Sequence, residues 1–215
     1  LFVLFIQLLT LTPYLLLGKS KGGMANRLLG FFLLAKALCI TNFLGFRLYD
    51  YTIEYFPYLF YFGTSFTILW GPLLYLYVKA LSSKSNQFSV KDVLHLIPFF
   101  LYFGWLTLSF HVKDAQTIRT MMNNGGFFTG SMWSTYFKLL YLYTLIYTLL
   151  TIPLLRKHQR DLKENFASLK KVNLNWMSFI VGGFFVKLAF DVLMYFSPHG
   201  STAGNFSIFM SRRVL

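Results

Sequence analysis

Six long apolar segments divide the chain and leave only short polar stretches between them. They cover residues of about 1–18, 28–46, 57–80, 92–110, 134–155 and 174–196. Each comes near the roughly 20 apolar residues that an α-helix needs to cross a bilayer. None alternates apolar and polar positions over ten residues, as the strands of a membrane barrel do. The pattern predicts an all-α fold, a polytopic transmembrane helical bundle with six visible spans that forms one domain over residues 1–215.

The composition excludes an ordinary water-soluble domain. Of the 215 residues, 56% are hydrophobic and 13% are charged, whereas soluble proteins are about 25% charged. Aromatic residues make up 20% of the chain, and disordered segments contain few of them. The opening segment has no charged leader and no small-residue cleavage site, so we interpret it as a span and not as a signal peptide.

The net charge of +13 is arranged by loop. Loops 19–27, 80–91 and 156–173, with Lys79 at the edge of the second, carry twelve Lys and Arg residues. The alternate loops carry three: Arg47, Lys113 and Arg119. By the positive-inside rule, the three basic loops face the cytoplasm and the N-terminus lies outside, in a multi-pass protein of the cytoplasmic (inner) membrane. Topology thus accounts for the charge, and a nucleic-acid footprint would instead form one basic face.

One loop holds a dense basic segment, consisting of Arg156, Lys157, Arg160, Lys163, Lys170 and Lys171. Acidic residues four positions after Lys157 and Arg160 favour a helical extension of the fifth span. Two interpretations stay open. The helix either lies solvated beside anionic lipid head groups, or it contacts a cytoplasmic partner.

Three ionisable residues lie deep inside predicted spans, namely Lys36, Lys187 and Asp191, whereas Lys138 is close enough to the outer end of its span to snorkel. Charge within a membrane is costly and therefore marks a candidate site. Lys187 and Asp191 are four residues apart, so they share a helix face and can pair. Lys36 either reaches Asp191 across the bundle, or it faces a polar cavity for an anionic or polar guest that Asn42 helps to line. A structural pair and a ligand site both remain possible at this stage.

Two further features bear on whether a helix can bend and on how a ligand could enter from the outer side. Gly71-Pro72 lies within the third span and predicts a kink; the kink is either packing geometry or a hinge that a ligand biases. Residues 111–133 form the longest non-cytoplasmic connection, with an Asn-Asn-Gly-Gly turn at 123–126. This segment is either a plain loop or a cover over an outer ligand mouth.

Residues for catalysis are lacking in the sequence. Asp191 is the one carboxylate deep inside a predicted span, and the four histidines have no ligand spacing. The single cysteine, Cys39, excludes a disulfide framework and a thiolate metal site. We therefore expect no enzymatic activity, no metal and no cofactor.

Three stretches and one short motif have a familiar order and spacing. They are Ser-Phe-Thr-Ile-Leu-Trp-Gly-Pro-Leu-Leu-Tyr-Leu-Tyr-Val-Lys at 65–79, Phe-Ser-Val-Lys-Asp-Val-Leu-His-Leu-Ile-Pro-Phe at 88–99, Glu-Asn-Phe-Ala-Ser-Leu-Lys-Lys-Val-Asn-Leu-Asn-Trp at 164–176, and Ala-Asn-Arg at 25–27. Together they resemble the N-terminal membrane module of membrane-anchored AraC-type transcriptional regulators. The resemblance implies a multi-helix sensor of seven or eight spans, followed by a cytoplasmic helix-turn-helix domain that binds DNA.

That resemblance determines the function we expect, and several alternative functions stay open. We expect a signal-sensing module that couples an outer or intramembrane signal to a DNA-binding domain absent from this chain. Six spans starting outside leave residue 197 outside, so the domain requires a seventh span, which we expect to be truncated here. Regulators of this type act on paired DNA sites, which favours a homodimer. A small transporter or channel subunit, the membrane module of a sensor kinase, and a scaffold for another membrane protein stay open as alternatives.

Overall fold

The computed structural model describes residues 2–18, 23–82 and 89–165, together with the pairs 182–183, 185–186, 189–190 and 192–193. Regular structure in this part of the chain is entirely helical and includes no strand. The predicted all-α class is therefore confirmed. The helices are α1 (Phe2–Leu17), α2 (Gly23–Arg47), α3 (Tyr49–Tyr55), η1 (Pro57–Leu59), α4 (Thr64–Thr67), α5 (Trp70–Ser82), α6 (Val90–Val93), η2 (Leu94–Leu96), α7 (Ile97–Leu106), η3 (Thr107–His111), α8 (Ala115–Asn123) and α9 (Gly130–Asn165).

The candidate membrane spans coincide with four of the six predicted segments. Within the described residues, three helices are long and apolar enough to cross a membrane: Gly23–Arg47, Val90–His111 and Gly130–His158. A fourth candidate, Pro57–Thr67 followed by Trp70–Ser82, is bent by 45° at its break. The first predicted segment forms α1, an apolar helix of 16 residues. The predicted span 174–196 lies outside the described residues, apart from the four helical pairs.

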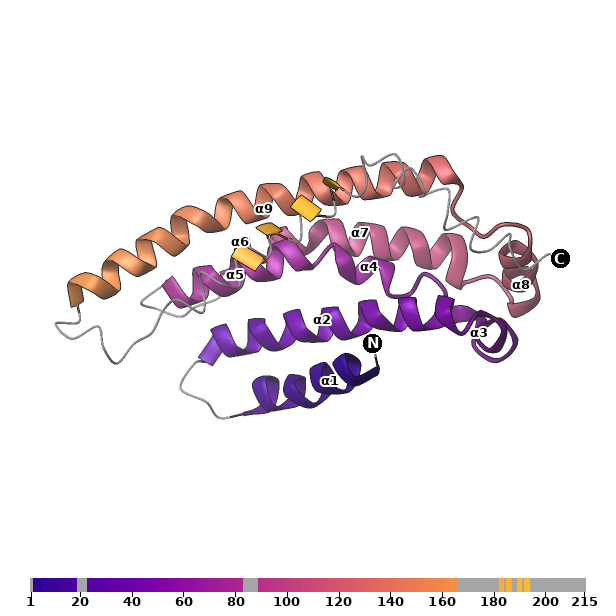
Figure 1. Cartoon of the computed structure of the whole chain (residues 1–215), viewed down its shortest axis with the longest axis horizontal. Coiled ribbons are helices and arrows are strands. Elements are labelled where there is room, and N and C mark those ends of the chain that lie inside the picture. Colours follow the sequence, from indigo (N-terminus) through magenta and orange to yellow (C-terminus); the bar gives the residue numbers. More distant parts are fainter. Residues whose placement is uncertain are drawn as a thin grey trace.

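The long helices run side by side, with α3 and α8 at one end of the molecule (Figure 1). The start of α2, the end of α5 and the end of α9 gather at the other end. Basic residues at this second end come from the three predicted cytoplasmic loops. They include Arg27, Lys79, Lys91, Arg156, Lys157 and Arg160. We call this second end the "basic end", and we call the end that holds α3 and α8 the "aromatic end".

Helix α9 continues well past the length of a span. It runs without interruption to Asn165, through Pro153, so the fifth span extends as a helix into the basic segment, as the sequence predicts. Arg156, Lys157 and Arg160 are exposed on it. The side chain of Lys163 and the residues Lys170 and Lys171 lie outside the described part.

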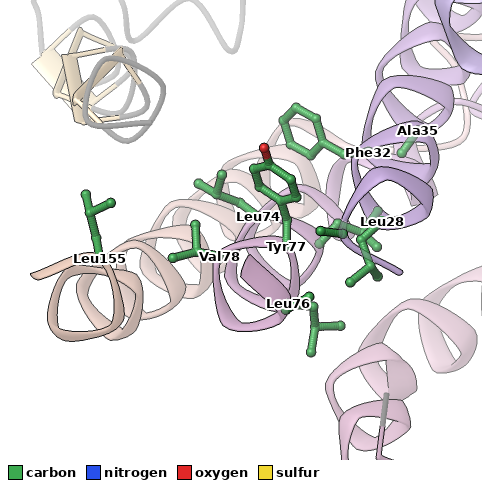
Figure 2. Close-up of a cluster of buried hydrophobic side chains, with 11 residues drawn as sticks. Leu28, Phe32, Ala35, Leu74, Leu76, Tyr77, Val78 and Leu155 are labelled. Carbon is green, nitrogen blue, oxygen red and sulfur yellow. The ribbon is translucent and has the colours of Figure 1, made fainter. Parts of the chain in front are cut away.

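A tightly packed core joins α2, α5 and α9 (Figure 2). Figure 2 shows Leu28 and Phe32 of α2 beside Leu74 and Tyr77 of α5. All four are nearly inaccessible to solvent. Between membrane helices close packing takes over the role that the hydrophobic effect plays in water. This core therefore fixes the position of α5, the helix that follows the break.

Small residues bring α5 and α9 together. A Cβ atom at Gly71 would lie 2.9 Å from the Cβ atom of Tyr147, so no larger residue fits there without a shift. The facing side of α9 presents the buried residues Thr148 and Thr151. Their hydroxyls donate to carbonyl oxygens of α9 itself, at 2.7 Å each. The polar groups are thus satisfied within one helix, and the interface stays close.

The connection 111–133 contains a helix, so the interpretation as a plain loop is wrong, and its role as a cover over an outer ligand mouth stays a prediction. Asp114 caps α8, because its carboxylate accepts the N–H of Thr117 at 3.0 Å. Ile118 and Met122, one helical turn apart, are both buried against the bundle. Gly125 and Gly126 follow with φ values of +102° and +89°, which makes the predicted turn. The signals for α8 were in the sequence as an N-cap followed by an i,i+4 apolar pair.

Candidate functional site

The fourth candidate span is a broken helix. Pro72 has no N–H, so the carbonyl of Ile68 loses its usual helical partner, and the chain bends between α4 and α5. Before the bend, the N–H groups of Ile68 and Leu69 bond to carbonyls three residues back, at 3.3 and 3.2 Å. Regular bonding resumes with the N–H of Leu73 on Leu69 at 2.9 Å. Gly71-Pro72 thus occupies the first turn after the bend.

Hydroxyl groups fill the hydrogen-bonding gaps of this break. Thr64 donates to the Tyr61 carbonyl and Thr67 to the Thr64 carbonyl, both at 2.5 Å. Tyr136 of α9 donates to the same Thr64 carbonyl at 2.8 Å, and its hydroxyl also contacts that of Thr67. Backbone groups that leave the regular helical pattern in an apolar environment require substitute partners of this kind. The break is therefore bonded to α9 through Tyr136.

On its other side, the break presses against α2. A Cβ atom at Gly63 would lie 2.5 Å from the Leu38 carbonyl oxygen and 2.6 Å from the Cβ atom of Asn42. Asn42 is 7% exposed, and within the described part of the chain its side-chain oxygen accepts no hydrogen bond. Asn42 thus lies in a helix contact, and it does not line either of the grooves described below.

Lys36 meets aromatic rings. Its Nζ atom lies 3.2 Å from the ring centroid of Trp70 and 5.5 Å from that of Phe32. Cation–π attraction of this kind strengthens away from water. Trp70 is the first residue of α5, so Lys36 contacts the broken helix just after its bend. Lys187 and Asp191 lie outside the described residues, and their predicted pairing stays a prediction.

A lateral groove of about 640 Å³ lies between α7 and α9 beside the break. One face of α9 forms its floor, from Ser131 to Ile146. Tyr102 and Trp105 of α7 form the opposite wall, and Ile68, at the bend itself, also lines it. The ring of Tyr102 stacks on that of Tyr136, with centroids 5.3 Å apart. Among the described lining residues none is charged.

A second groove, of about 420 Å³, lies between α2, α5 and α7. Its described lining is entirely apolar, with residues such as Phe31, Leu73 and Phe100. The two grooves therefore differ in chemistry, because only the first one carries hydroxyl groups. Neither groove was foreseen, since which helix faces meet does not follow from the position of the spans.

Polar contacts tie the basic end together. Lys79 of α5 pairs with Asp92 of α6 at 2.5 Å, and Asp92 is almost fully buried. Asp92 also accepts the N–H of Ser89 at 3.0 Å in a capping box. One turn further, Nδ1 of His95 lies 2.9 Å from the hydroxyl of Tyr147 of α9. The stretches 65–79 and 88–99 are thus in direct contact with each other.

Rings in edge-to-face contact hold the aromatic end. Tyr61 is 2% exposed, and its ring centroid lies 5.0–5.4 Å from those of Phe46, Phe110 and Phe128. Its backbone has a φ of 63°, a strained value for a residue with a side chain. The hydroxyl accepts the N–H of Phe127 at 3.3 Å. The aromatic cluster comprises Phe60, Tyr61, Leu106, Phe110, Ile118, Met122 and Phe128.

Helix α8 locks this cluster onto α3. The guanidinium of Arg119 donates to the carbonyls of Ile53 and Glu54, at 3.0 and 2.6 Å, and so satisfies the free carbonyls at the end of α3. Burial, and to a lesser degree the nearby Asp50 carboxylate, raises the pKa of Tyr49. Sequence reasoning missed the cluster, although the density of Phe and Tyr at 55–62 and 127–137 was its visible signal.

Comparison of the chain with known protein families, with functionally characterised proteins and with solved structures finds no match. Within the described residues, no group of three or more His, Cys, Asp or Glu side chains is placed to hold a metal ion. The function of the groove and of the break is therefore inferred from the chemistry of the residues that form them.

Proposed function

We propose that the chain is a membrane-embedded sensing module of an AraC-type transcriptional regulator, with its aromatic end outside and its basic end in the cytoplasm. The observation that supports this most is the broken helix α4–α5. It starts at the aromatic cluster, passes the groove and ends at Lys79 in the basic end. It is thus one element in contact with both ends of the molecule.

A sensor needs an element with two arrangements that the signal can bias. The break has bonds of a suitable kind, because its carbonyls are held by Tyr136 and by threonine hydroxyls, which can be exchanged without breaking a regular helix. A signal that shifts Tyr136 would change the support of Thr64 and Thr67. The end of α5 would then move against Asp92 and His95.

The output rests on the resemblance alone. In the AraC-type pattern, a helix-turn-helix pair follows the membrane module on the cytoplasmic side, after a further span. DNA would be bound only by that domain, and a dimer would match paired sites. The coding sequence downstream of Leu215 tests this output. We expect a helix-turn-helix pair, and a kinase domain or a stop codon would contradict it.

The sensing role is tested by Pro72→Ala in the full-length protein, with Gly104→Ala as a matched control. Gly104 lies in α7, and a Cβ atom there would meet nothing within 4 Å. Restoring an N–H at position 72 favours a straighter helix, so we expect target transcripts to change at least threefold while membrane levels stay constant. The control should behave as wild type. Unchanged transcripts in Pro72→Ala would contradict the proposal.

A second candidate function is transport, and the charge of Lys36 within α2 is the observation that favours it. A transporter would lose flux in proteoliposomes when Lys36 is replaced by Met. The sensor proposal expects no specific flux in the wild-type protein. Flux that depends on Lys36 would favour the transporter and count against the sensor.

A further inference from the structure

We infer that the groove between α7 and α9 binds a single-chain amphiphile whose head group is uncharged and forms hydrogen bonds. The inference deepens the proposed function and rests on it for the placement of the chain in a membrane. It assigns the class of signal that such a module would detect.

The groove has the length of one lipid tail. Its floor extends along α9 from Ser131 to Ile146, which corresponds to about 22 Å at about 1.5 Å per residue. One leaflet of the hydrocarbon core is about 15 Å thick. The volume of about 640 Å³ lies within the range of small-molecule sites. A single extended chain therefore fits along α9 with room for a small head.

The aliphatic hydroxyls of the described lining lie at one end of this floor. Ser131 and Thr135 occupy the first turns of α9, near the aromatic end, whereas Leu139, Leu142 and Ile146 follow deeper in the groove. Tyr143 also lines the deeper part, but its hydroxyl already donates to the His95 carbonyl at 3.3 Å. This gradient orients an amphiphile, with its head toward Ser131 and its tail toward Ile146. In the proposed topology the head then lies at the outer surface.

The absence of charge in the described lining selects the head group. A carboxylate or phosphate here would give up water without gaining a cation, which is costly. A hydroxyl or ester head can instead bond to Ser131 and Thr135. The second groove offers no such group in its described lining, so we expect ordinary lipid chains there, without a preferred head.

An amphiphile bound in the groove would contact the break between α4 and α5 directly. Ile68, at the bend, lines the groove, and so does Tyr136, which donates to the Thr64 carbonyl. Tyr102, stacked on Tyr136, forms the facing wall. A chain that enters between Tyr102 and Leu139 must therefore press on the support of the broken helix.

Photolabelling tests the site in the full chain, reconstituted in phosphatidylcholine nanodiscs. The probe is a monoacylglycerol with a diazirine in its acyl chain. We expect label on α9 between Leu139 and Ile146 and on the facing part of α7. Excess unlabelled monoacylglycerol should remove it, and oleate at alkaline pH should compete at least tenfold less well.

Two variants of one helix provide the matched comparison. Leu139 lines the groove and Leu149 does not, although both leucines are exposed on α9, by 62% and 49%. We expect Leu139→Trp to fill the groove and lower labelling at least fivefold, while Leu149→Trp leaves it unchanged. Thr135→Val, which keeps the shape of the side chain, should weaken competition by monoacylglycerol about threefold through the lost hydroxyl.

Several results would overturn the site. Label spread evenly over the exposed faces of α7 and α9, equal competition by oleate, or equal labelling in both Trp variants would each do so. The site and the proposed function can fail separately. Specific labelling without any transcript response to monoacylglycerol would contradict the sensor and keep the site. A response to Pro72→Ala without specific labelling would keep the sensor and overturn the site.

Discussion

The two ends of the molecule are held together by different forces. At the aromatic end, rings in edge-to-face contact surround Tyr61, and Arg119 bonds to backbone carbonyls. At the basic end, the Lys79–Asp92 pair and the His95–Tyr147 contact join α5, α6 and α9. Ring packing depends on shape and changes little with salt, whereas ion pairs respond to salt and to nearby charge.

This difference suggests a division of roles along the broken helix. The aromatic end is a rigid anchor, because its rings interlock and the strained backbone of Tyr61 is over-determined by its neighbours. At the basic end the polar contacts are the adjustable part, because they respond to salt and to nearby charge, whereas the core of α2, α5 and α9 fixes α5 beside them. A sensor whose output lies in the cytoplasm needs this order, with a fixed end outside and a responsive end inside.

The largest effect is expected at Tyr61. Replacing it by Ala removes a buried ring from the aromatic cluster, and losses for buried aromatic residues are about 3–5 kcal/mol. Tyr61→Phe keeps the ring and loses only the bond from the Phe127 N–H, which is worth about 1 kcal/mol. The free energy of unfolding in mixed detergent micelles measures both. Equal losses in the two variants would show that ring packing is not what holds this end.

The next largest loss of stability is expected at Gly71, which lies between the two ends. An added Cβ atom must displace Tyr147, and overpacking of this kind costs about 1–3 kcal/mol. Gly71→Ala should therefore lower the free energy of unfolding, whereas Gly104→Ala should not, because the space beside Gly104 is open. The same detergent titration compares them. A neutral Gly71→Ala would mean that α5 and α9 are not locked together at this point.

A smaller effect is expected from Lys79→Gln at the basic end. The Lys79 side chain is 40% exposed, so screening by solvent limits the loss to about 1 kcal/mol. The distinguishing readout is salt. The wild-type free energy of unfolding should fall as NaCl is raised, and Lys79→Gln should flatten that dependence, while the exposed Lys91→Gln should not. If Lys79→Gln had the same salt dependence as the wild type, the Lys79–Asp92 ion pair would not be what makes the stability of the basic end depend on salt.

The smallest effect is local and depends on pH. The hydroxyl and N–H of Thr117 hold the pKa of the Asp114 carboxyl below its usual value. Because the folded-state pKa is the lower one, the cap contributes fully above the ordinary pKa of about 3.9 and is lost as pH falls through the folded-state value. The protection of the α8 amides against hydrogen exchange, taken relative to their intrinsic exchange rates at each pH, should therefore fall in acid. Asp114→Asn should abolish that change, and an unaltered profile would show that Asp114 does not cap α8.

The sequence predicted the elements that one-dimensional patterns encode. Apolar length located the helices that contain Ala35, Leu74 and Thr148, and Pro72 predicted the bend. The alternation of charge predicted which helix ends gather together. Each of these features depends on covalent chemistry or on the thickness of a bilayer. Each can therefore be predicted without knowing which residues meet in the folded protein.

Side-chain partners across helices were not predictable in the same way. Lys36 was expected to meet a carboxylate or a polar cavity, and the described structure adds the ring of Trp70. Tyr61 and Tyr136 appeared as two among many aromatic residues, and only the meeting of α4, α7 and α9 gives them their roles. The groove likewise arises from three helix faces whose rotation is set by packing, including the close contacts at Gly63 and Gly71.

The central claim is that the aromatic and basic ends lie on opposite sides of a membrane. Substituted-cysteine labelling tests it most directly, because the single native cysteine, Cys39, is buried. Gln116 on α8 and Lys91 on α6 are both exposed, and each is changed to Cys in turn. In intact cells, a membrane-impermeant maleimide should label Gln116→Cys, and it should label Lys91→Cys only after the membrane is permeabilised. Labelling of both variants, or of Lys91→Cys alone, in intact cells would contradict the account.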